Sequence, residues 1–261
     1  MNLLKRIIKK TRPEVYDSIK KEVLLFRDKY VGSQEQILQD DIFRIAEDIN
    51  GLDLLLFPVE DDELCGFICD YKGQLFIYVN THLPYEKQIF TLAHELYHYL
   101  KNGDKELLNS RSIDETEELD MEDRKANLFA ALLLVPEKAL QNQLELMKIR
   151  GSSDIDELKL IKLMNVFAVP YKTIVLRLLE TGILKDKEAK SWLEIPDRDL
   201  NKGILYLINK HKVGERWQNR TDEVKFSNLK ALIYDSDELE LLPENRIKKD
   251  LSLLEQDDVS E

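Results

Sequence analysis

The chain has 261 residues, of which 43% are hydrophobic and 34% are charged. This composition is typical of a globular, helix-rich protein of one or two domains, and it excludes a fibrous or disordered chain. Acidic residues outnumber basic ones by 50 to 38, and the resulting net charge of −12 disfavours direct binding to nucleic acid. No apolar run approaches the roughly 18 residues that a membrane-spanning helix needs.

The cysteine content and the first residues indicate where the protein works. The only two cysteines, Cys65 and Cys69, provide no disulfide framework, which fits a reducing compartment. Their CxxxC spacing on a predicted strand favours two core thiols over a second metal site. The opening sequence MNLLKRIIKK lacks the continuous apolar segment of a secretion signal. We therefore expect a cytoplasmic protein.

The N-terminal residues predict helices. Residues 1–12 place apolar side chains at helical spacing among basic ones, and residues 14–30 form a second helical segment after Pro13. Ser33 and Gln36 have the spacing of a capping box and predict the start of a third helix. Its apolar stripe consists of Leu38, Ile42, Ile45 and Ile49.

An extended pattern replaces the helical one after residue 51. Residues 54–59, 65–71 and 74–80 are rich in β-branched, aromatic and leucine side chains and predict three strands. Lys72–Gly73 is a turn that makes the last two strands antiparallel. Pro58 predicts that the first strand lies at an edge of the sheet.

Helical periodicity returns after the sheet. Residues 85–101 predict a helix, and residues 104–122 carry many acids and few apolar side chains, which predicts a long surface loop. A further helix is expected at 123–135. Residues 154–182 have a helix-turn-helix outline. Residues 185–261 carry no recognisable motif and end in an acidic tail.

One helix of this series carries a pattern with a chemical meaning. His94 and His98 are four residues apart, so on a helix they lie on one face and can present two imidazole nitrogens to one ion. Glu95 lies at the flank of this pair, where its carboxylate can reach a water molecule in the open coordination position. This is the arrangement of the HExxH metalloprotease motif. It predicts a catalytic zinc site.

Such a zinc site needs a third protein ligand from another segment. The sequence leaves four candidates, which are Asp123 and Glu122 at the start of the next helix, and His82 and His211 elsewhere. Asn127 lies one helical turn after Asp123 and could form a hydrogen bond to a ligand histidine.

Two sequence blocks resemble the zinc peptidases of the ImmA/IrrE type. The first is HELYHYL, and the second is DRKANLFAALLLVP. The family patterns are HELGHYL and E-x-x-A-N-x-F-A followed by an apolar run to a proline. The matching positions in the second block are Ala126, Asn127, Phe129, Ala130 and Pro136. The resemblance covers about residues 40–180.

The resemblance implies an α+β, mainly helical fold with a small thermolysin-like zincin core and a short antiparallel or mixed sheet. It implies Zn²⁺ as cofactor, bound by His94, His98 and Asp123, with Glu95 as the catalytic base. Two positions depart from the pattern. Asp123 replaces the usual glutamate, which keeps Glu122 open as an alternative ligand, and Tyr97 replaces a glycine, which would narrow the site.

Together these features predict a zinc endopeptidase whose substrate is a protein. Family members promote cleavage of helix-turn-helix repressors, which relieves repression of mobile elements or stress genes. We expect the substrate to add as a strand to residues 74–80. Two alternatives are a DNA-binding regulator that uses residues 154–182 and a toxin-like partner that acts by binding alone. We expect four regions, namely N-terminal helices (1–50), the peptidase core (51–150), helix-turn-helix-like helices (151–184) and a C-terminal helical region (185–261).

Overall fold

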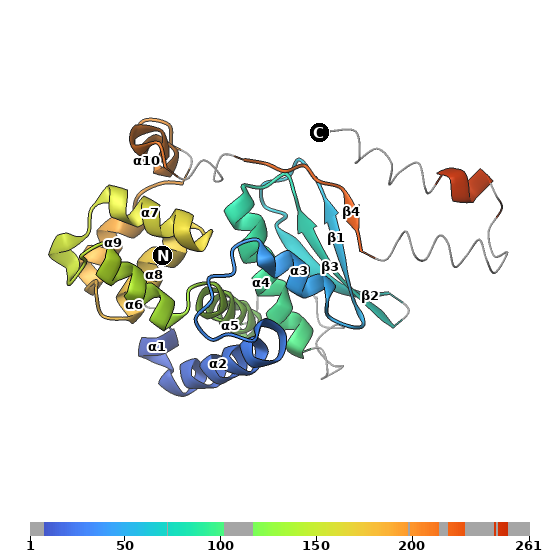
Figure 1. The fold of residues 1–261 in the computed structure, drawn as a ribbon, viewed down its shortest axis with the longest axis horizontal. Coiled ribbons are helices and arrows are strands. Elements are labelled where there is room, and N and C mark those ends of the chain that lie inside the picture. Colours follow the sequence, from blue (N-terminus) through green and yellow to red (C-terminus); the bar gives the residue numbers. More distant parts are fainter. Residues whose placement is uncertain are drawn as a thin grey trace.

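The computed structural model describes residues 8–71, 73–101, 117–197, 199–213, 219–227, 243 and 245–249. The fold is α+β and mainly helical, as predicted, with one small four-stranded sheet. Figure 1 shows the sheet on one side of the molecule and the helices α6–α9 on the other, with α4 and α5 between them. Within the described residues, no helix is both long and apolar enough to cross a bilayer.

The N-terminal helices differ from the prediction in one respect. Helices α1 (Ile8–Thr11) and α2 (Pro13–Phe26) are present, and α2 continues as a short π-helix, η2 (Arg27–Val31). The predicted capping box does not start a helix. Ser33 Oγ accepts hydrogen bonds from the amides of residues 35 and 36, but the chain there closes only a turn. Helix α3 (Asp41–Glu47) begins only later. All four residues of the predicted stripe are buried, with Ile42 and Ile45 on α3 and Leu38 and Ile49 on either side of it.

The sheet combines parallel and antiparallel strands in the order β2-β3-β1-β4. Strand β1 (Leu52–Phe57) pairs in parallel with β3 (Gln74–Asn80), and β3 pairs antiparallel with β2 (Gly66–Tyr71), as predicted. On its other side, β1 pairs antiparallel with β4 (Lys225–Phe226). The last strand comes from the C-terminal region, where the sequence contains no recognisable strand pattern.

Two predictions about the sheet are wrong. Strand β1 is not an edge strand, since β3 and β4 lie on its two sides. It ends at Phe57, so Pro58 follows the strand and removes no hydrogen bond from the ladder. Strand β3 cannot accept an added peptide strand, because β2 and β1 already occupy both of its sides. In the part of the chain that the structure describes, the sheet therefore ends at β2 and β4.

Helix α4 (Tyr85–Lys101) packs against β2 and β3. At Gly66, the first residue of β2, a Cβ atom would lie 2.5 Å from both Thr91 Cγ2 and the carbonyl oxygen of Tyr78. Any larger residue would push β2 away from the helix. This glycine therefore allows the sheet edge to lie directly beside α4.

Helix α5 (Glu117–Leu134) begins earlier than the expected residue 123. The end of the predicted surface loop is therefore helical. The remainder of that loop, residues 104–116, lies outside the described residues.

The C-terminal half consists of short helices, which are α6 (Glu137–Leu146), η4 (Ser152–Asp154), α7 (Glu157–Phe167), α8 (Tyr171–Glu180), α9 (Asp186–Leu193) and α10 (Ile204–His211). Helices α7 and α8 occupy the predicted helix-turn-helix outline. Helix α8 is the one that would have to enter a DNA groove. Its buried residues are Tyr171, Thr173, Ile174, Val175, Arg177, Leu178 and Leu179.

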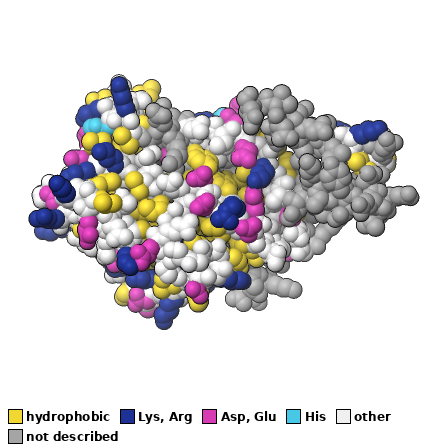
Figure 2. Space-filling view, in the orientation of Figure 1, with side chains coloured by type: hydrophobic (Ala, Val, Ile, Leu, Met, Phe, Trp, Pro, Cys, Tyr) yellow, Lys and Arg dark blue, Asp and Glu magenta, His cyan; other side chains and the backbone are white. Residues whose placement is uncertain are grey.

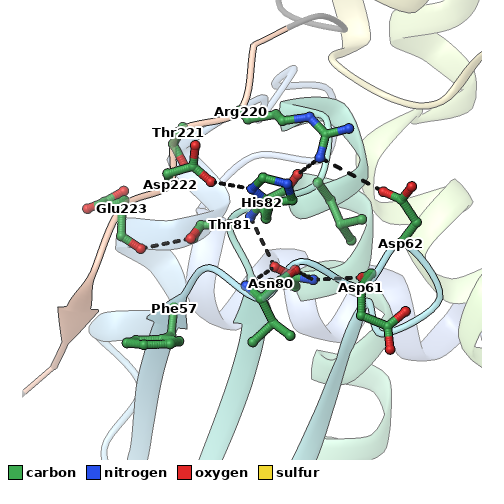
Figure 3. Close-up of polar contacts among 12 residues, drawn as sticks. Phe57, Asp61, Asp62, Asn80, Thr81, His82, Arg220, Thr221, Asp222 and Glu223 are labelled. Carbon is green, nitrogen blue, oxygen red and sulfur yellow. Dashed lines mark hydrogen bonds and ion pairs between the residues drawn. The ribbon is translucent and has the colours of Figure 1, made fainter.

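Residues 219–223 lie along the connection between β3 and α4 (Figure 3). Thr81 Oγ1 donates a hydrogen bond to the Glu223 carbonyl at 2.8 Å, and the Asp222 amide donates to the Thr81 carbonyl at 3.2 Å. His82 Nδ1 lies 2.7 Å from Asp222 Oδ1. These contacts lead the chain onto the sheet, where β4 then pairs with β1.

The Asn80 side chain forms hydrogen bonds to backbone groups around the same connection between β3 and α4, and it lies below His82 in Figure 3. Its side chain is fully buried, and Nδ2 donates to the carbonyl oxygens of Val59, Asp61 and Leu64 at 2.8–3.1 Å. Its Oδ1 accepts hydrogen bonds from the amides of Val59 and His82. One side chain thus serves five backbone groups.

Replacing Asn80 with Ala should therefore lower the free energy of unfolding by about 2–4 kcal/mol, because backbone groups would lose their partners in a buried place. Urea denaturation followed by circular dichroism measures this change. The exposed Asn201 offers a matched control, and Asn201→Ala should change stability by no more than about 0.5 kcal/mol. Equal effects of the two substitutions would contradict the role of Asn80.

Candidate metal centre

Helix α4 brings His94 and His98 together as the sequence spacing predicts. Their Nε2 atoms are 3.2 Å apart, and their ring centroids are 5.0 Å apart. Two nitrogens bound tetrahedrally to one zinc ion at about 2.0–2.1 Å would be about 3.3 Å apart. The distance between the two Nε2 atoms therefore matches that of a shared metal ligand pair.

Helix α5 adds Asp123 to this pair. Its Oδ1 atom lies 3.9 Å from His98 Nε2, and the ligand atoms of the three residues all lie within 4.8 Å of one another. The Asp123 side chain is 68% exposed, so it has space to approach the imidazoles. Two imidazole nitrogens and one carboxylate oxygen form a donor set that could hold a metal ion and leave one position open. Among the described residues, no other group of His, Cys, Asp and Glu fits a metal ion in this way.

Asn127 orients the first of these histidines. Its Oδ1 atom lies 3.2 Å from His94 Nδ1, and because a carbonyl oxygen only accepts, Nδ1 must donate the proton. The lone pair of Nε2 is then available on the side of His98. Burial lowers the pKa of His94, although the hydrogen bond to Asn127 and the charge of Asp123 act in the opposite direction. The imidazole is therefore neutral at neutral pH, which is the form that binds metal ions.

Glu95 follows His94 in the chain and is buried, with 6% of its surface exposed. Most of its neighbours on α4 are apolar and fully buried, including Ala93 and Leu96. A carboxylate in such a position is unusual, since burial of a charged group is costly. The role of Glu95 as the catalytic base stays a prediction.

Glu122 points to a different partner from Asp123. Its Oε2 accepts a hydrogen bond from the Tyr97 hydroxyl at 3.0 Å, and its Oε1 forms an ion pair with Lys125. Burial tends to raise the pKa of Glu122, but the hydrogen bonds from Lys125 and Tyr97 outweigh it and hold this pKa below its usual range. Glu122 is thus engaged away from the group formed by the two histidines and Asp123.

Tyr97 is a functional neighbour that the sequence analysis interpreted differently. Its ring is 1% exposed and lies 5.8 Å from Phe129, inside the interface of α4 and α5, whereas we expected it to narrow the site. It also meets His98 edge to face, at 5.5 Å between ring centroids. The pair of Tyr97 and Glu122 therefore connects the two helices one residue away from His98 and Asp123. The sequence positions of Tyr97 and Glu122 do not indicate that their side chains form a hydrogen bond.

The remaining candidates lie elsewhere. His82 is paired with Asp222 at the end of the sheet (Figure 3), and His211 Nε2 lies 3.6 Å from Glu157 Oε2. Cys65 and Cys69 form no disulfide with each other and are half-buried in and beside β2. None of these side chains belongs to the group formed by His94, His98 and Asp123.

Three substitutions on α5 should reduce the metal affinity to different extents. Asp123→Ala removes a ligand and should have the largest effect, whereas Asn127→Ala should weaken binding by about 10–100-fold, the usual cost of losing a residue that orients a ligand. Glu122→Ala should have the smallest effect, because Glu122 lies outside the donor set. Competition with a chromogenic zinc chelator measures the three constants. A larger loss for Glu122→Ala than for Asp123→Ala would shift the ligand assignment by one residue.

Comparison with known proteins places this geometry in a family. The family model described as the IrrE N-terminal-like domain, a peptidase family, matches residues 49–179, which is half of the chain. No curated protein matches. One similar solved structure is a Mycobacterium tuberculosis transcriptional regulator, with 16% identity and a TM-score of 0.44. The match covers 64% of this chain and 50% of that one, so the chain spans half the length of that structure. The family match confirms the resemblance seen in the sequence, and the chain belongs to the IrrE N-terminal-like family of metallopeptidases.

Proposed function

We propose that the protein is a zinc-dependent endopeptidase. The observation that carries this proposal is the 3.2 Å distance between the Nε2 atoms of His94 and His98, with Asp123 on the neighbouring helix completing the donor set. A set of two imidazoles and one carboxylate with an open position is characteristic of catalytic zinc. The membership in a metallopeptidase family supports the same function.

The residues would divide the chemistry as follows. His94, His98 and Asp123 hold the ion, and Asn127 keeps His94 in the correct tautomer. A zinc ion bound there would polarise the carbonyl of the scissile bond and lower the pKa of a water molecule. Glu95 accepts the proton of the attacking water and then passes it to the leaving amine. Its burial beside His94 supports this role.

The substrate would bind as an extended strand along β2. This strand forms the edge of the sheet on the side away from β4, and an exposed edge is a template for adding a peptide strand. The close approach of Gly66 to Thr91 places β2 directly beside α4, which carries the histidines. β2 therefore replaces β3 in our interpretation of the substrate edge.

We further propose that the substrate is a helix-turn-helix repressor, and that cleavage in the cytoplasm relieves repression of a mobile element or a stress response. This substrate class follows from the resemblance carried by HELYHYL and DRKANLFAALLLVP. The acidic net charge of −12 is suited to recognition of a basic DNA-binding protein rather than of DNA itself.

Direct DNA binding receives less support. Most of α8 is buried against the rest of the protein, so this helix is not available to enter a major groove. Figure 2 shows Lys and Arg interspersed with Asp and Glu over the described residues of one face, and no continuous basic surface forms among them there. Helices α7 and α8 instead contribute to the hydrophobic core.

A cleavage assay with a repressor encoded beside the gene tests the proposal. The zinc-loaded protein should convert the purified repressor into two fragments that mass spectrometry identifies, and a chelator should prevent this. An intact repressor that forms a stable complex with the protein would instead show a regulator that acts by binding. Protection of the promoter by the protein alone would show a DNA-binding regulator. Either result would reject the peptidase.

A further inference from the structure

A cavity of about 250 Å³ lies between α4, α5 and α8. Its apolar lining comes from Ile8 on α1, Phe90 on α4, Leu128 and Ala131 on α5, and Leu176 on α8. Asn127, which binds His94, also lines it. The cavity therefore adjoins the metal centre and shares one residue with it.

The positions of two residue pairs show how α4 and α5 run past each other. His98 lies 3.9 Å from Asp123, and His94 lies 3.2 Å from Asn127. The residue number decreases by four on α4 and increases by four on α5, so the two helices are antiparallel at this place. Each pair is one helical turn from the next, which is about 5.4 Å along the axis.

The next pair in this series is Phe90 with Ala131, and both line the cavity. The cavity thus borders α5 from Arg124 to Ala131 and extends one turn beyond His94 along α4. A distance of about 5.4 Å along the helix axis is within reach of a single side chain. A peptide positioned for cleavage could therefore place one of its side chains there.

The size and the charges of the cavity define what fits. Its volume corresponds to on the order of eight water molecules, and it is smaller than the roughly 300–1,000 Å³ of sites for drug-sized ligands. Three charged residues line it, and each interacts within the protein. Lys172 Nζ lies 3.3 Å from Asp197 Oδ2, Glu180 binds Arg177, and Arg124 also has a partner. A single uncharged, apolar side chain is the best match.

We propose that this cavity is the specificity pocket of the peptidase, and that it binds a bulky apolar side chain of the substrate next to the cleaved bond. The proposal rests on the proposed function, because it takes the metal centre as the place of cleavage. Phe90, Ala131 and Leu176 would then determine specificity without taking part in the chemistry.

Two metal-binding hydroxamates provide the test on the full-length, zinc-loaded protein. Acetohydroxamic acid carries only a methyl group, whereas 3-phenylpropanohydroxamic acid adds a phenyl group that can reach the cavity. Burial of the phenyl group should increase affinity by roughly 10–100-fold, measured by isothermal titration calorimetry. Equal affinities of the two compounds would overturn the proposal.

Substitutions on α5 and α8 test whether the gain in affinity from the phenyl group depends on the cavity. Ala131→Phe fills the cavity and should reduce the advantage of the phenyl compound to below about threefold, with unchanged zinc content and acetohydroxamate affinity. Leu176→Ala enlarges the cavity and should favour a naphthyl compound over the phenyl one. Leu146→Ala is the matched control, because Leu146 is 75% exposed on α6 and lies outside the cavity lining.

The outcomes separate this proposal from the proposed function. If zinc and acetohydroxamate bind but neither cavity variant changes the preference for the tail, the pocket assignment fails and the metal centre stands. If neither zinc nor acetohydroxamate binds, the proposed function itself fails. A preference altered equally by Leu146→Ala would also reject the pocket.

Discussion

Replacing Glu95 with Gln is expected to lower the rate of repressor cleavage by about 10²–10⁴-fold, while zinc content and fold remain unchanged. The amide is nearly isosteric with the carboxylate, so it fits the buried position on α4, but it cannot accept the proton of the attacking water. Single-turnover cleavage followed by gel electrophoresis measures the rate. Zinc content is measured on the same sample by mass spectrometry.

The control comes from the same helix. Glu86 is also a buried glutamate of α4, but it lies two turns before His94, and Glu86→Gln should leave the cleavage rate within a few-fold of the parent. If both variants lose activity equally, the loss reflects disturbance of α4 rather than a missing base. If Glu95→Gln cleaves as fast as the parent, another group activates the water.

Replacing either His94 or His98 with Ala should reduce the zinc content from about one ion per chain to nearly none. Each variant retains only two of the three proposed ligands. Because a bound metal stabilises the folded state alone, the melting temperature should also become insensitive to added zinc. Elemental analysis and thermal unfolding with and without zinc measure both effects.

The matched controls are the two histidines outside the site. His82→Ala and His211→Ala should keep the full zinc content, because these residues pair with Asp222 and Glu157 instead. Unchanged zinc in both His94→Ala and His98→Ala would refute the metal centre. Loss of zinc in all four variants would indicate a general loss of structure.

Local patterns in the sequence predicted local structure well. The helical spacing of His94 and His98, the antiparallel pair of β2 and β3, and the helices α7 and α8 all depend on residues close together in the chain. Asp123, which lies on a separate helix, was one of four candidates from the residues alone, and the resemblance to the family singled it out. Periodicity and short motifs predict this local structure because they depend on the geometry of a single helix or strand.

The errors concern relations between distant segments. Pro58 suggested an edge strand, but the end of β1 at Phe57 made the proline irrelevant to the ladder. The role of β3 was wrong because β1, which precedes it by about twenty residues, pairs with the side of β3 that β2 leaves open. β1 in turn is interior because β4, whose two residues carry no pattern, pairs with it. The hydrogen bond between Tyr97 and Glu122 escaped prediction because it needs the relative rotation of two helices.

The cavity beside the metal centre is another feature that depends on contacts between distant segments and could not be predicted from the sequence. Its lining residues come from α1, α4, α5 and α8, and its apolar ones are ordinary core-facing positions of their own helices. Only the antiparallel alignment of α4 and α5 shows that Phe90 and Ala131 continue the row that contains the histidines. Specificity is therefore less visible in the sequence than the chemistry of cleavage.

The pairing of β1 with β4 affects how the protein emerges from the ribosome. Phe226 pairs with Leu55, so the edge of β1 waits for a partner that is synthesised roughly 170 residues later, which takes roughly 10–35 s at about 5–20 residues per second. During that interval the nascent chain presents an open strand edge, which is a site for aggregation or chaperone binding. Completion of the sheet thus has to wait until the two residues of β4 have been synthesised.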